Sequence, residues 1–331
     1  MSISDTDRTM AQALNDALRE EMERDPRVFL MGEDIGHYGG VFGVTRGLFA
    51  QFGPERVRDT PISESGFIGA AIGAAAAGWR PVVEIMWIDF AMVAMDQIVN
   101  QAAKMRYMSG GQLKIPLVIR TQEGAGRGNG AQHSQSLESM FAQVPGLKVV
   151  APSNPRDAKA LLKAAIREDS PVLFIEHKLL YGFRGPVLPT DEVVPLGIAS
   201  VVRPGSDVTI LSLSRMVHFC LEAAQKLANM GIEAEVIDLR SVQPWDIDAV
   251  AKSVQKTGRL VIVHEAHRSF GWGAEIAATL AERGFDHLLA PIRRVCSDDV
   301  PFPYNRQLER AVMPDPQRIV TTVQELLRDY P

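Results

Sequence analysis

Short apolar runs alternate along the first half of the chain with longer segments in which apolar residues recur at helical spacing. Such runs, bounded by turn signals, are typical of strands buried in a parallel sheet, and the longer segments are typical of helices that cover it. The pattern predicts strands at residues 28–31, 81–85, 117–120, 149–151 and 172–176. It predicts helices at residues 66–77, at 90–107, after Asn154-Pro155, and near the N-terminus, where one face carries Met10, Leu14, Ala17 and Leu18. This alternation predicts an α/β fold.

Glycine and proline residues then interrupt the pattern at positions 181–195, which we interpret as a linker; they are Gly182, Gly185, Pro186, Pro189 and Pro195. A second alternation follows, with strands at residues 208–213, 234–238 and 260–264 and helices at 216–230, 247–257 and 274–282. A chain of 331 residues also exceeds the size at which one core usually keeps growing. The sequence therefore predicts two domains, residues 1–185 and 186–331.

Composition excludes several classes of protein. Hydrophobic residues make up 46% of the chain and charged residues 23%, which argues against disorder. The formal charge of -5 provides no broad positive field, so we expect neither a nucleic-acid partner nor an anionic membrane. The least polar stretch, residues 66–79, is interrupted by Arg80, Pro81 and Glu84 before it reaches bilayer-spanning length.

The two cysteines and the N-terminal segment bear on the compartment. Cys220 and Cys296 lie far apart in sequence and indicate neither a disulfide framework nor a cysteine-based zinc site. The first 25 residues carry acidic side chains and lack the basic start and apolar stretch of a secretory signal. We therefore expect a cytoplasmic protein.

A glycine-rich segment, GAGRGNG, begins at Gly124 directly after a predicted strand. A dinucleotide-binding fingerprint would require glycine at its sixth position, where this chain has Asn129. The better interpretation is a loop whose backbone passes close to another group, because glycine permits near approach and unusual dihedral angles. The chain also lacks the Gly-x-Ser-x-Gly segment of serine hydrolases and the Walker loop of nucleotide hydrolases.

Three groups of residues could carry chemistry. His264, Glu265 and His267 could ligate a metal, but an isolated His-x-x-His at a strand end is more often a polar edge, so no metal site is predicted. Glu64 begins a helix of small residues; there it could serve chemistry or, with a neighbouring serine as cap, simply suit the helix dipole. His133 stands among small polar residues and could act as acid, base or charge stabiliser, or be structural.

Several segments, taken together and in order, resemble the β-subunit family of the thiamine-diphosphate-dependent 2-oxo acid dehydrogenases. They are GEDIGHYGGVFGVTRGL, RVRDTPISESGFIGAAIGAA, DQIVNQAAKMRYMSGG, AQHSQSLE, PGLKVVAPSNPRDAK, SVQKTGRLVIVHEAHRSFGWGAEIA and DDVPFPYNRQLE. The resemblance thus covers nearly the whole chain. It implies a transketolase-like pyrimidine-binding domain, with a parallel sheet flanked by helices, followed by a transketolase C-terminal-type α/β domain.

The same resemblance implies an assembly of two α and two β chains with thiamine diphosphate between chains. Its aminopyrimidine would lie against the β subunit, and its diphosphate and magnesium would be held mainly by the α subunit. In agreement, the chain lacks the Gly-Asp-Gly segment with which related families hold the metal-bound diphosphate. We therefore expect half an active site, with no activity in the chain alone.

Four residues match the family's cofactor site. Glu64 matches the glutamate that hydrogen-bonds N1′ of the aminopyrimidine, and Ile62 would enclose that carboxyl group together with the cofactor. Phe90 falls where relatives place an aromatic residue beside the aminopyrimidine, although it could equally be a core residue. His133 matches the histidine near the thiazolium ring.

The resemblance implies oxidative decarboxylation of a 2-oxo acid with acyl transfer to lipoamide. Pyruvate is the first choice; acetoin cleavage is second, because NQAAKMRYM, EHKLLY and SRMVH resemble that subgroup as much, and branched-chain substrates are third. Family members bind a lipoyl acyltransferase core through their second domain, and Asp298 and Asp299 could contribute to that contact or be solvated loop acids. A module that only assembles the complex remains the non-enzymatic alternative.

Overall fold

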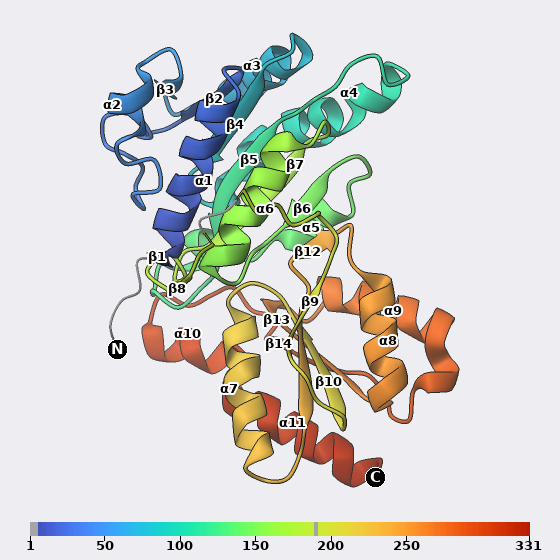
Figure 1. Cartoon of the computed structure of the whole chain (residues 1–331). Coiled ribbons are helices and arrows are strands. Elements are labelled where there is room, and N and C mark those ends of the chain that lie inside the picture. The colour runs from blue at the N-terminus through green and yellow to red at the C-terminus, as the bar shows by residue number, and fades with distance from the viewer. Residues whose placement is uncertain (1–5, 189–190) are drawn as a thin grey trace. The chain divides into compact units, whose positions relative to one another are not determined.

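A computed structural model describes residues 6–188 and 191–331 of the chain, which form two compact units. The first unit runs to Glu123 and resumes from Met140 to Leu196, and the second comprises Gly124–Ser139 and Gly197–Pro331 (Figure 1). The segment that carries His133 therefore belongs to the second unit. The start of the N-terminal segment and Pro189 of the predicted linker lie outside the described residues.

The first unit is built on a parallel sheet whose strands follow the order β6-β7-β5-β4-β2-β3. Every one of the predicted strands is present, with ends that differ by a few residues from the prediction. The strands are β2 (Val28–Gly32), β3 (Val57–Asp59), β4 (Arg80–Ile85), β5 (Val118–Glu123), β6 (Lys148–Val150) and β7 (Val172–His177). The helices are α1 (Met10–Arg24), α2 (Leu48–Phe52), α3 (Glu64–Ala76), α4 (Ala103–Met108), α5 (Glu138–Ala142) and α6 (Pro155–Arg167).

Helices α1 and α6 pack side by side over this sheet (Figure 1). The α1 helix starts at a capping box, in which the Thr9 side chain accepts from the Gln12 main chain and Gln12 reciprocates. The side chains of Lys159 and Lys163 on α6 donate to the two carboxylate oxygens of Glu20 on α1, at 2.6 and 2.7 Å. Apolar contact on one face and these ion pairs at its edge hold the two helices together.

The second unit contains a five-stranded sheet with the order β14-β13-β10-β11-β9, in which only the edge strand β9 is antiparallel. The strands are β9 (Ser200–Arg203), β10 (Val208–Ser212), β11 (Ala234–Asp238), β13 (Leu260–His267) and β14 (Arg293–Ser297), and a short strand β12 spans Ser241–Gln243. The helices are α7 (Met216–Ala228), α8 (Ile247–Thr257), α9 (Trp272–Gly284), α10 (Arg306–Val312) and α11 (Pro316–Asp329), and a 3-10 turn, η4, spans Phe285–His287. Helices α7 and α11 pack together over a buried core.

Two sequence predictions need correction. The helix predicted at residues 90–107 is instead a 3-10 segment, η1 (Ile88–Ala94), a π-helical turn, η2 (Gln97–Ala102), and α4. Apolar spacing does not distinguish these hydrogen-bonding patterns, so the irregularity was invisible in the sequence. The linker predicted at 181–195 contains a strand, β8 (Arg184–Pro186), that pairs antiparallel with β1 (Asp7–Thr9).

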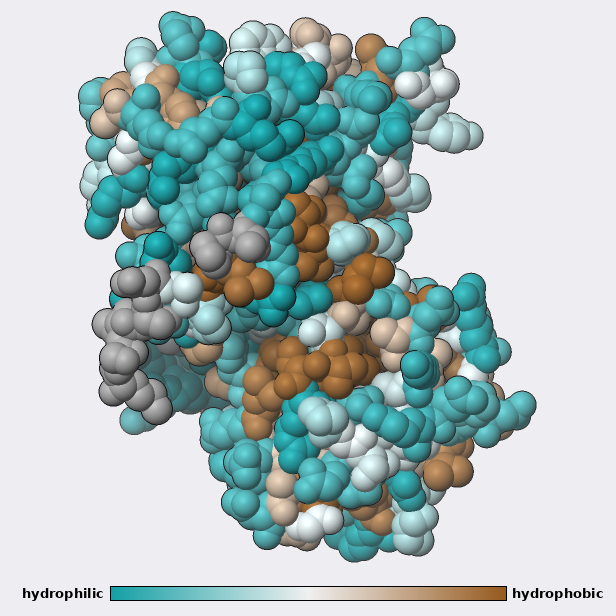
Figure 2. Space-filling model, viewed as in Figure 1, coloured by the Kyte–Doolittle hydropathy of each residue, from teal (hydrophilic) through white to brown (hydrophobic). Residues whose placement is uncertain are grey.

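The surface of each unit is mainly hydrophilic on the face shown in Figure 2, with separate brown areas where apolar residues gather. This mixture agrees with charged side chains spread along the chain. None of the helices in the described part of the chain combines the length and the apolar character that crossing a bilayer requires.

Candidate functional site

Glu64 is the first residue of α3 and is largely buried, with 8% of its surface exposed. The serine-capping alternative is not what the structure shows: the Ser63 side chain makes no capping hydrogen bond, and Ser65 Oγ donates to the Val93 carbonyl at 2.5 Å. The Glu64 carboxyl group has no hydrogen-bond or ion-pair partner among the described residues. The carboxyl group is therefore available to a ligand or to another chain.

A second carboxyl group lies close enough to interact with Glu64. Glu33 follows strand β2, and its Oε1 atom is buried without a hydrogen-bond partner. Burial raises the pKa of Glu33, and the negative charges of Glu64, Asp34 and Glu84 raise it further. This corner of the first unit is therefore acidic and short of hydrogen-bond donors, which a nitrogen-rich ligand could supply.

Apolar side chains adjoin Glu64. Ile62, two residues earlier, is 83% exposed, an unusual position for a large aliphatic residue. The η1 segment contacts α3 and carries Phe90, which is half-buried, together with the exposed Met92 and Val93. A buried acid beside accessible apolar side chains suits a flat aromatic ring with polar nitrogens at its edge. The group expected here, an aminopyrimidine, has that character.

Several main-chain donors of the glycine-rich loop are already in use. Ala125 N donates to Glu265 Oε1 at 2.5 Å, and Gly126 N and Gly128 N donate to the two carboxylate oxygens of Glu309 at 2.9 and 2.8 Å. A dinucleotide-binding loop needs such N–H groups for phosphate, and these three already have carboxylate partners. The predicted close approach is also present, because a Cβ atom on Gly128 would lie 2.9 Å from the Tyr304 carbonyl oxygen.

His133 ends a 3-10 turn, η3 (Ala131–His133), that follows this loop. Its ring is partly exposed, and the side chains after it alternate: Ser134, Ser136 and Glu138 are buried, and Gln135 is partly exposed. Burial, and next the charge of Glu265, raise the pKa of Glu138 to about 7. His133 is thus displayed at the surface of a segment whose other side is anchored inside the second unit.

A cavity of about 550 Å³ adjoins the His133 segment. Its walls are Ala131, Gln132 and Gln135 from that segment, and His267, Ser269, Asp299, Val300, Pro301 and Phe302 from the loops after β13 and β14. His267 Nδ1 lies 2.7 Å from the Asp298 carbonyl oxygen, so this nitrogen carries a proton. The imidazole ring stacks on Phe302, with 5.2 Å between ring centroids.

The possible metal ligands at the end of β13 have other partners. His264 Nδ1 lies 3.1 Å from the Ala266 carbonyl oxygen, and its Nε2 lies 3.3 Å from Cys296 Sγ. Burial lowers the pKa of His264 to about 4, so the ring is neutral at pH 7. Over residues 6–188 and 191–331, no group of three histidine, cysteine, aspartate or glutamate side chains is arranged to hold a metal ion.

Asp298 and Asp299 are exposed but interact within the second unit. Asp299 accepts hydrogen bonds from Ser269 N and Oγ, at 3.0 and 2.6 Å, and these bonds lower the pKa of Asp299. The Oδ1 atom of Asp298 lies 3.5 Å from Nη2 of Arg318, which makes an ion pair. A role for these two residues in binding a partner stays a prediction.

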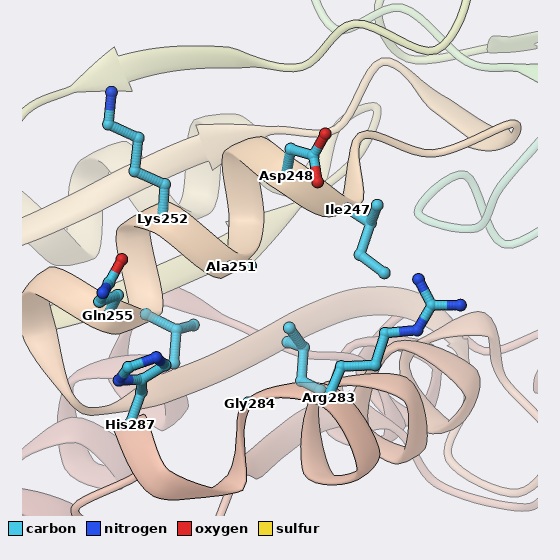
Figure 3. Close-up of a pocket in the computed structure, with 10 residues that line it drawn as sticks. Ile247, Asp248, Ala251, Lys252, Gln255, Arg283, Gly284 and His287 are labelled. Carbon is cyan, nitrogen blue, oxygen red and sulfur yellow. The ribbon is translucent and has the colours of Figure 1, made fainter.

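A further cavity, of about 370 Å³, lies between α8 and α9 (Figure 3). In Figure 3, Asp248 and Lys252 point away from α9, and Arg283 and Ile247 extend into the space between the helices. His287 lies at the other end of this space, beside Gln255. This groove contains no acid and base facing one another, and it does not include any residue singled out from the sequence.

Sequence reasoning missed the roles of Glu33, Glu265 and Glu309. Glu265 was considered only as a metal ligand, and Glu309 was seen only within the segment DDVPFPYNRQLE. The contacts of Glu265 and Glu309 with the glycine loop join residues 140 and 183 positions apart. The only available signal was the coincidence of four glycines in one loop with isolated acids after later apolar runs.

Comparisons with known proteins match two consecutive parts of the chain to two family models. Residues 6–184 match the family described as "Transketolase, pyrimidine binding domain", and residues 197–319 match "Transketolase, C-terminal domain". Among solved structures, the chain is similar to "Split gene transketolase, inactive beta4 tetramer", with a TM-score of 0.81, 25% identity, and coverage of 98% of this chain and 99% of that one. A transketolase from Pichia stipitis, 14% identical, shares the fold over 47% of its own length with a TM-score of 0.73.

Curated relatives are similar over nearly the full chain. "Pyruvate dehydrogenase E1 component subunit beta-1, mitochondrial" of Arabidopsis thaliana is 50% identical over 94% of this chain and 87% of its own length. "Pyruvate dehydrogenase E1 component subunit beta" of Rickettsia felis is 49% identical over 96% of this chain and 98% of its own length.

Proposed function

The chain belongs to the family of pyruvate dehydrogenase E1 component β subunits, and on that premise we propose that it acts with an α subunit in the oxidative decarboxylation of pyruvate, with acyl transfer to lipoamide. The observation that carries the proposal is the identity of about half of all residues over nearly the whole length of both chains. The carboxyl group of Glu64, which has no partner among the described residues, is available for the cofactor contact that the resemblance assigns to it.

Glu64 is the central catalytic residue of this proposal. When bound, thiamine diphosphate supplies the electron sink that lets a 2-oxo acid lose carbon dioxide. With the cofactor bound, Glu64 would share a proton with N1′ of the aminopyrimidine, and this would favour the tautomer on which loss of the proton from the reactive carbon depends. Its fixed place at the first turn of α3 and its burial suit this task, since no other described residue competes for its oxygens.

Ile62 and Phe90 hold the aminopyrimidine ring by apolar contact. Ile62 offers a largely exposed side chain beside Glu64, and Phe90 lies on η1, which contacts the same helix. Stacking of Phe90 on the aminopyrimidine ring would contribute on the order of 0.5–1.5 kcal/mol beyond the area that it buries. These two residues therefore position the ring, and Glu64 acts on it.

His133 serves the substrate end of the site. Its partly exposed ring lies at the edge of a loop that is fixed by main-chain hydrogen bonds. We assign it to stabilising the bound oxo acid and handling protons during acyl transfer. Gln132 and Gln135 line the adjoining cavity and are available to orient a ligand.

The cofactor is divided between subunits in this proposal. Residues 1–185 bind the pyrimidine half, and the α subunit holds most of the diphosphate and the magnesium ion. The residues present support this division. The first unit offers an acid and apolar side chains that suit a pyrimidine, whereas three N–H groups of the glycine loop already donate to carboxylates and cannot bind a diphosphate. Two α and two β chains assemble, and residues 186–331 make subunit contacts and bind the lipoyl acyltransferase core. A cytoplasmic location is part of the proposal.

Pyruvate remains the preferred substrate. The relatives described above are named as pyruvate dehydrogenase components, which favours pyruvate over acetoin and over branched-chain 2-oxo acids. The decisive experiment is to assay the purified chain alone and after reconstitution with its α subunit, using each of the three substrates. We expect no turnover by the chain alone and the highest kcat/KM for pyruvate after reconstitution. Turnover by the chain alone, or preference for acetoin, would contradict the proposal.

A module that only assembles the complex makes a different prediction for Glu64→Gln. If the chain were a scaffold, this variant would turn over at the wild-type rate in the reconstituted complex. We expect instead a loss of at least about 100-fold, a typical contribution of general acid–base catalysis, with assembly unchanged on a sizing column. Glu55→Gln, which alters an 87% exposed acid, is the matched control.

A further inference from the structure

We propose that Glu309 is a positioning residue for His133, holding the glycine loop in the one conformation that presents the histidine to substrate. This inference rests on the proposed function, because it takes His133 to be a catalytic residue. It adds a role for α10, because it makes the conformation of the loop depend on a carboxylate from that helix.

The contact is a two-pronged hydrogen bond from one main chain to one carboxylate. Gly126 N donates to Glu309 Oε1 at 2.9 Å, and Gly128 N donates to Glu309 Oε2 at 2.8 Å. Hydrogen bonds to an ionised group are roughly twice as strong as neutral ones, and two at once also fix orientation. Glu309 is 1% exposed, so water cannot substitute for these donors. The carboxylate would therefore lose its hydrogen-bond donors if the loop moved, and the two N–H groups would lose their acceptor if the carboxylate were removed.

Local structure places Glu309 for this contact. Asn305 caps α10, accepting from Gln307 N and Leu308 N at 2.9 and 3.2 Å, and Glu309 N donates to the Asn305 carbonyl oxygen at 2.8 Å. Glu309 thus lies on the first turn of a capped helix, with its side chain turned inward while its neighbours Leu308 and Arg310 are exposed. The Asn305 cap fixes where α10 begins, and the helix in turn fixes the position of the Glu309 carboxylate.

The loop is shaped to receive it. Gly126 and Gly128 have φ values of 103° and 69°, a region that other residues rarely adopt. Next to them, Ala125 is fully buried in an apolar cluster with Phe302 and Met313, and its N–H donates to Glu265. The loop is therefore fixed at Ala125, Gly126 and Gly128 before it reaches His133. The same fixing places Gln132 in the wall of the 550 Å³ cavity.

The experiment compares Glu309→Ala, Glu309→Gln and Glu309→Asp with the control Arg310→Ala, which alters an exposed side chain of the same helix. Each variant is reconstituted with the α subunit, and kcat and KM for pyruvate are measured per bound thiamine diphosphate. Hydrogen–deuterium exchange of the peptide that spans residues 124–133 is measured on the same complexes. Scaling to bound cofactor removes any effect of unfolded protein on the rate.

For Glu309→Ala we expect faster exchange at the loop and a kcat about 100-fold lower, the scale of loss from a small misplacement, with little change in KM. Glu309→Asp should recover part of kcat because it keeps the charge. Glu309→Gln should have a kcat between those of Glu309→Ala and Glu309→Asp, since its amide has one acceptor oxygen for the two N–H groups. If Glu309→Ala does not fold, Glu309→Gln carries the test.

Two results would overturn the inference. One is unchanged exchange at residues 124–133 in Glu309→Ala or Glu309→Gln, because the carboxylate would then not hold the loop. The other is faster exchange with kcat within about twofold of Arg310→Ala, because the loop would then not position His133. If the wild-type complex itself fails to turn over pyruvate, the proposed function fails, and the exchange measurement still decides whether Glu309 holds the loop.

Discussion

Two regions of the chain, one in each unit, use buried acids in opposite ways. At the start of α3, Glu64 and the nearby Glu33 have carboxyl oxygens with no hydrogen-bond partner among the described residues. Around the glycine loop, Glu265 and Glu309 accept main-chain N–H groups within 2.5–2.9 Å. A buried acid whose oxygens are satisfied by its own chain is part of the fold, whereas one left unsatisfied is a cost to the fold.

This difference corresponds to two proposed tasks, holding a loop in one conformation and contacting a cofactor. In the second unit, the carboxylates of Glu265 and Glu309 fix the backbone of the glycine loop. In our proposal, this holds His133 in one place. In the proposed function, the carboxyl group of Glu64 in the first unit has no partner within the chain because it serves the cofactor. Substitutions should therefore change stability most where the acids are partnered, and activity most where they are not.

The largest effect on stability is expected at Arg120, the partner of two further acids in the first unit. Its guanidinium group donates to both Glu176 oxygens and to Glu84, each at 2.7 Å, and Tyr181 also donates to Glu176, at 2.6 Å. Arg120→Met leaves two carboxylates buried without their cation, which typically costs about 3–5 kcal/mol. Urea unfolding of the purified chain measures the loss. A loss below about 1 kcal/mol would mean that partnered acids are not structural here.

A smaller, pH-dependent effect is expected at Glu138, which lies between the two cases. Its Oε2 atom is buried without a partner, and burial, followed by the charge of Glu265, raises its pKa from 4.5 to about 7. The folded chain therefore keeps this proton at pH values where the unfolded chain has lost it. The resulting stabilisation is complete below pH 4.5 and is lost as the pH rises to about 7, a total of about 3 kcal/mol.

Glu138→Gln removes this titration and tests it. The variant should unfold at higher urea concentration than the wild type at pH 8, and this advantage should shrink or reverse at pH 5. Comparing the two chains at each pH cancels the other titrating groups. An advantage of Glu138→Gln that is equal at both pH values would contradict the shifted pKa.

The smallest effect on stability is expected for Glu64→Gln. A neutral amide replaces a carboxyl group that has no partner, so the free energy of unfolding should stay within about 1 kcal/mol of the wild type or rise. The control Glu55→Gln breaks an exposed ion pair with Arg58 and should also change it by less than about 1 kcal/mol. A clear loss of stability in Glu64→Gln would mean that this acid has a structural partner after all.

The sequence predicted the regular part of the fold well, and the reasons are local. Strand β11 and helix α8 were predicted with their bounds as found, since turn residues flank both and α8 has a side-chain cap from Asp246. It also placed Glu64 at the start of α3, because the run of small residues marks that helix. In contrast, β14 and α11 were not predicted.

The chemistry of the acids was harder to predict. Whether a glutamate is satisfied depends on groups far away in the chain, as the 183 positions between Gly126 and Glu309 illustrate. No local pattern distinguishes Glu64, without a partner, from Glu309, with two. The resemblance to a known family supplied the role of Glu64, and only the three-dimensional arrangement revealed that of Glu309.

The most direct test of the account is made on Glu64 in the reconstituted complex. The measurement is the rate at which the acidic carbon-bound proton of thiamine diphosphate exchanges with D₂O, in the wild type and in Glu64→Gln, under saturating cofactor. We predict that exchange in the variant is slower by at least about 100-fold, while the cofactor remains bound. Equal exchange rates with the cofactor bound would show that this carboxyl group does not activate it.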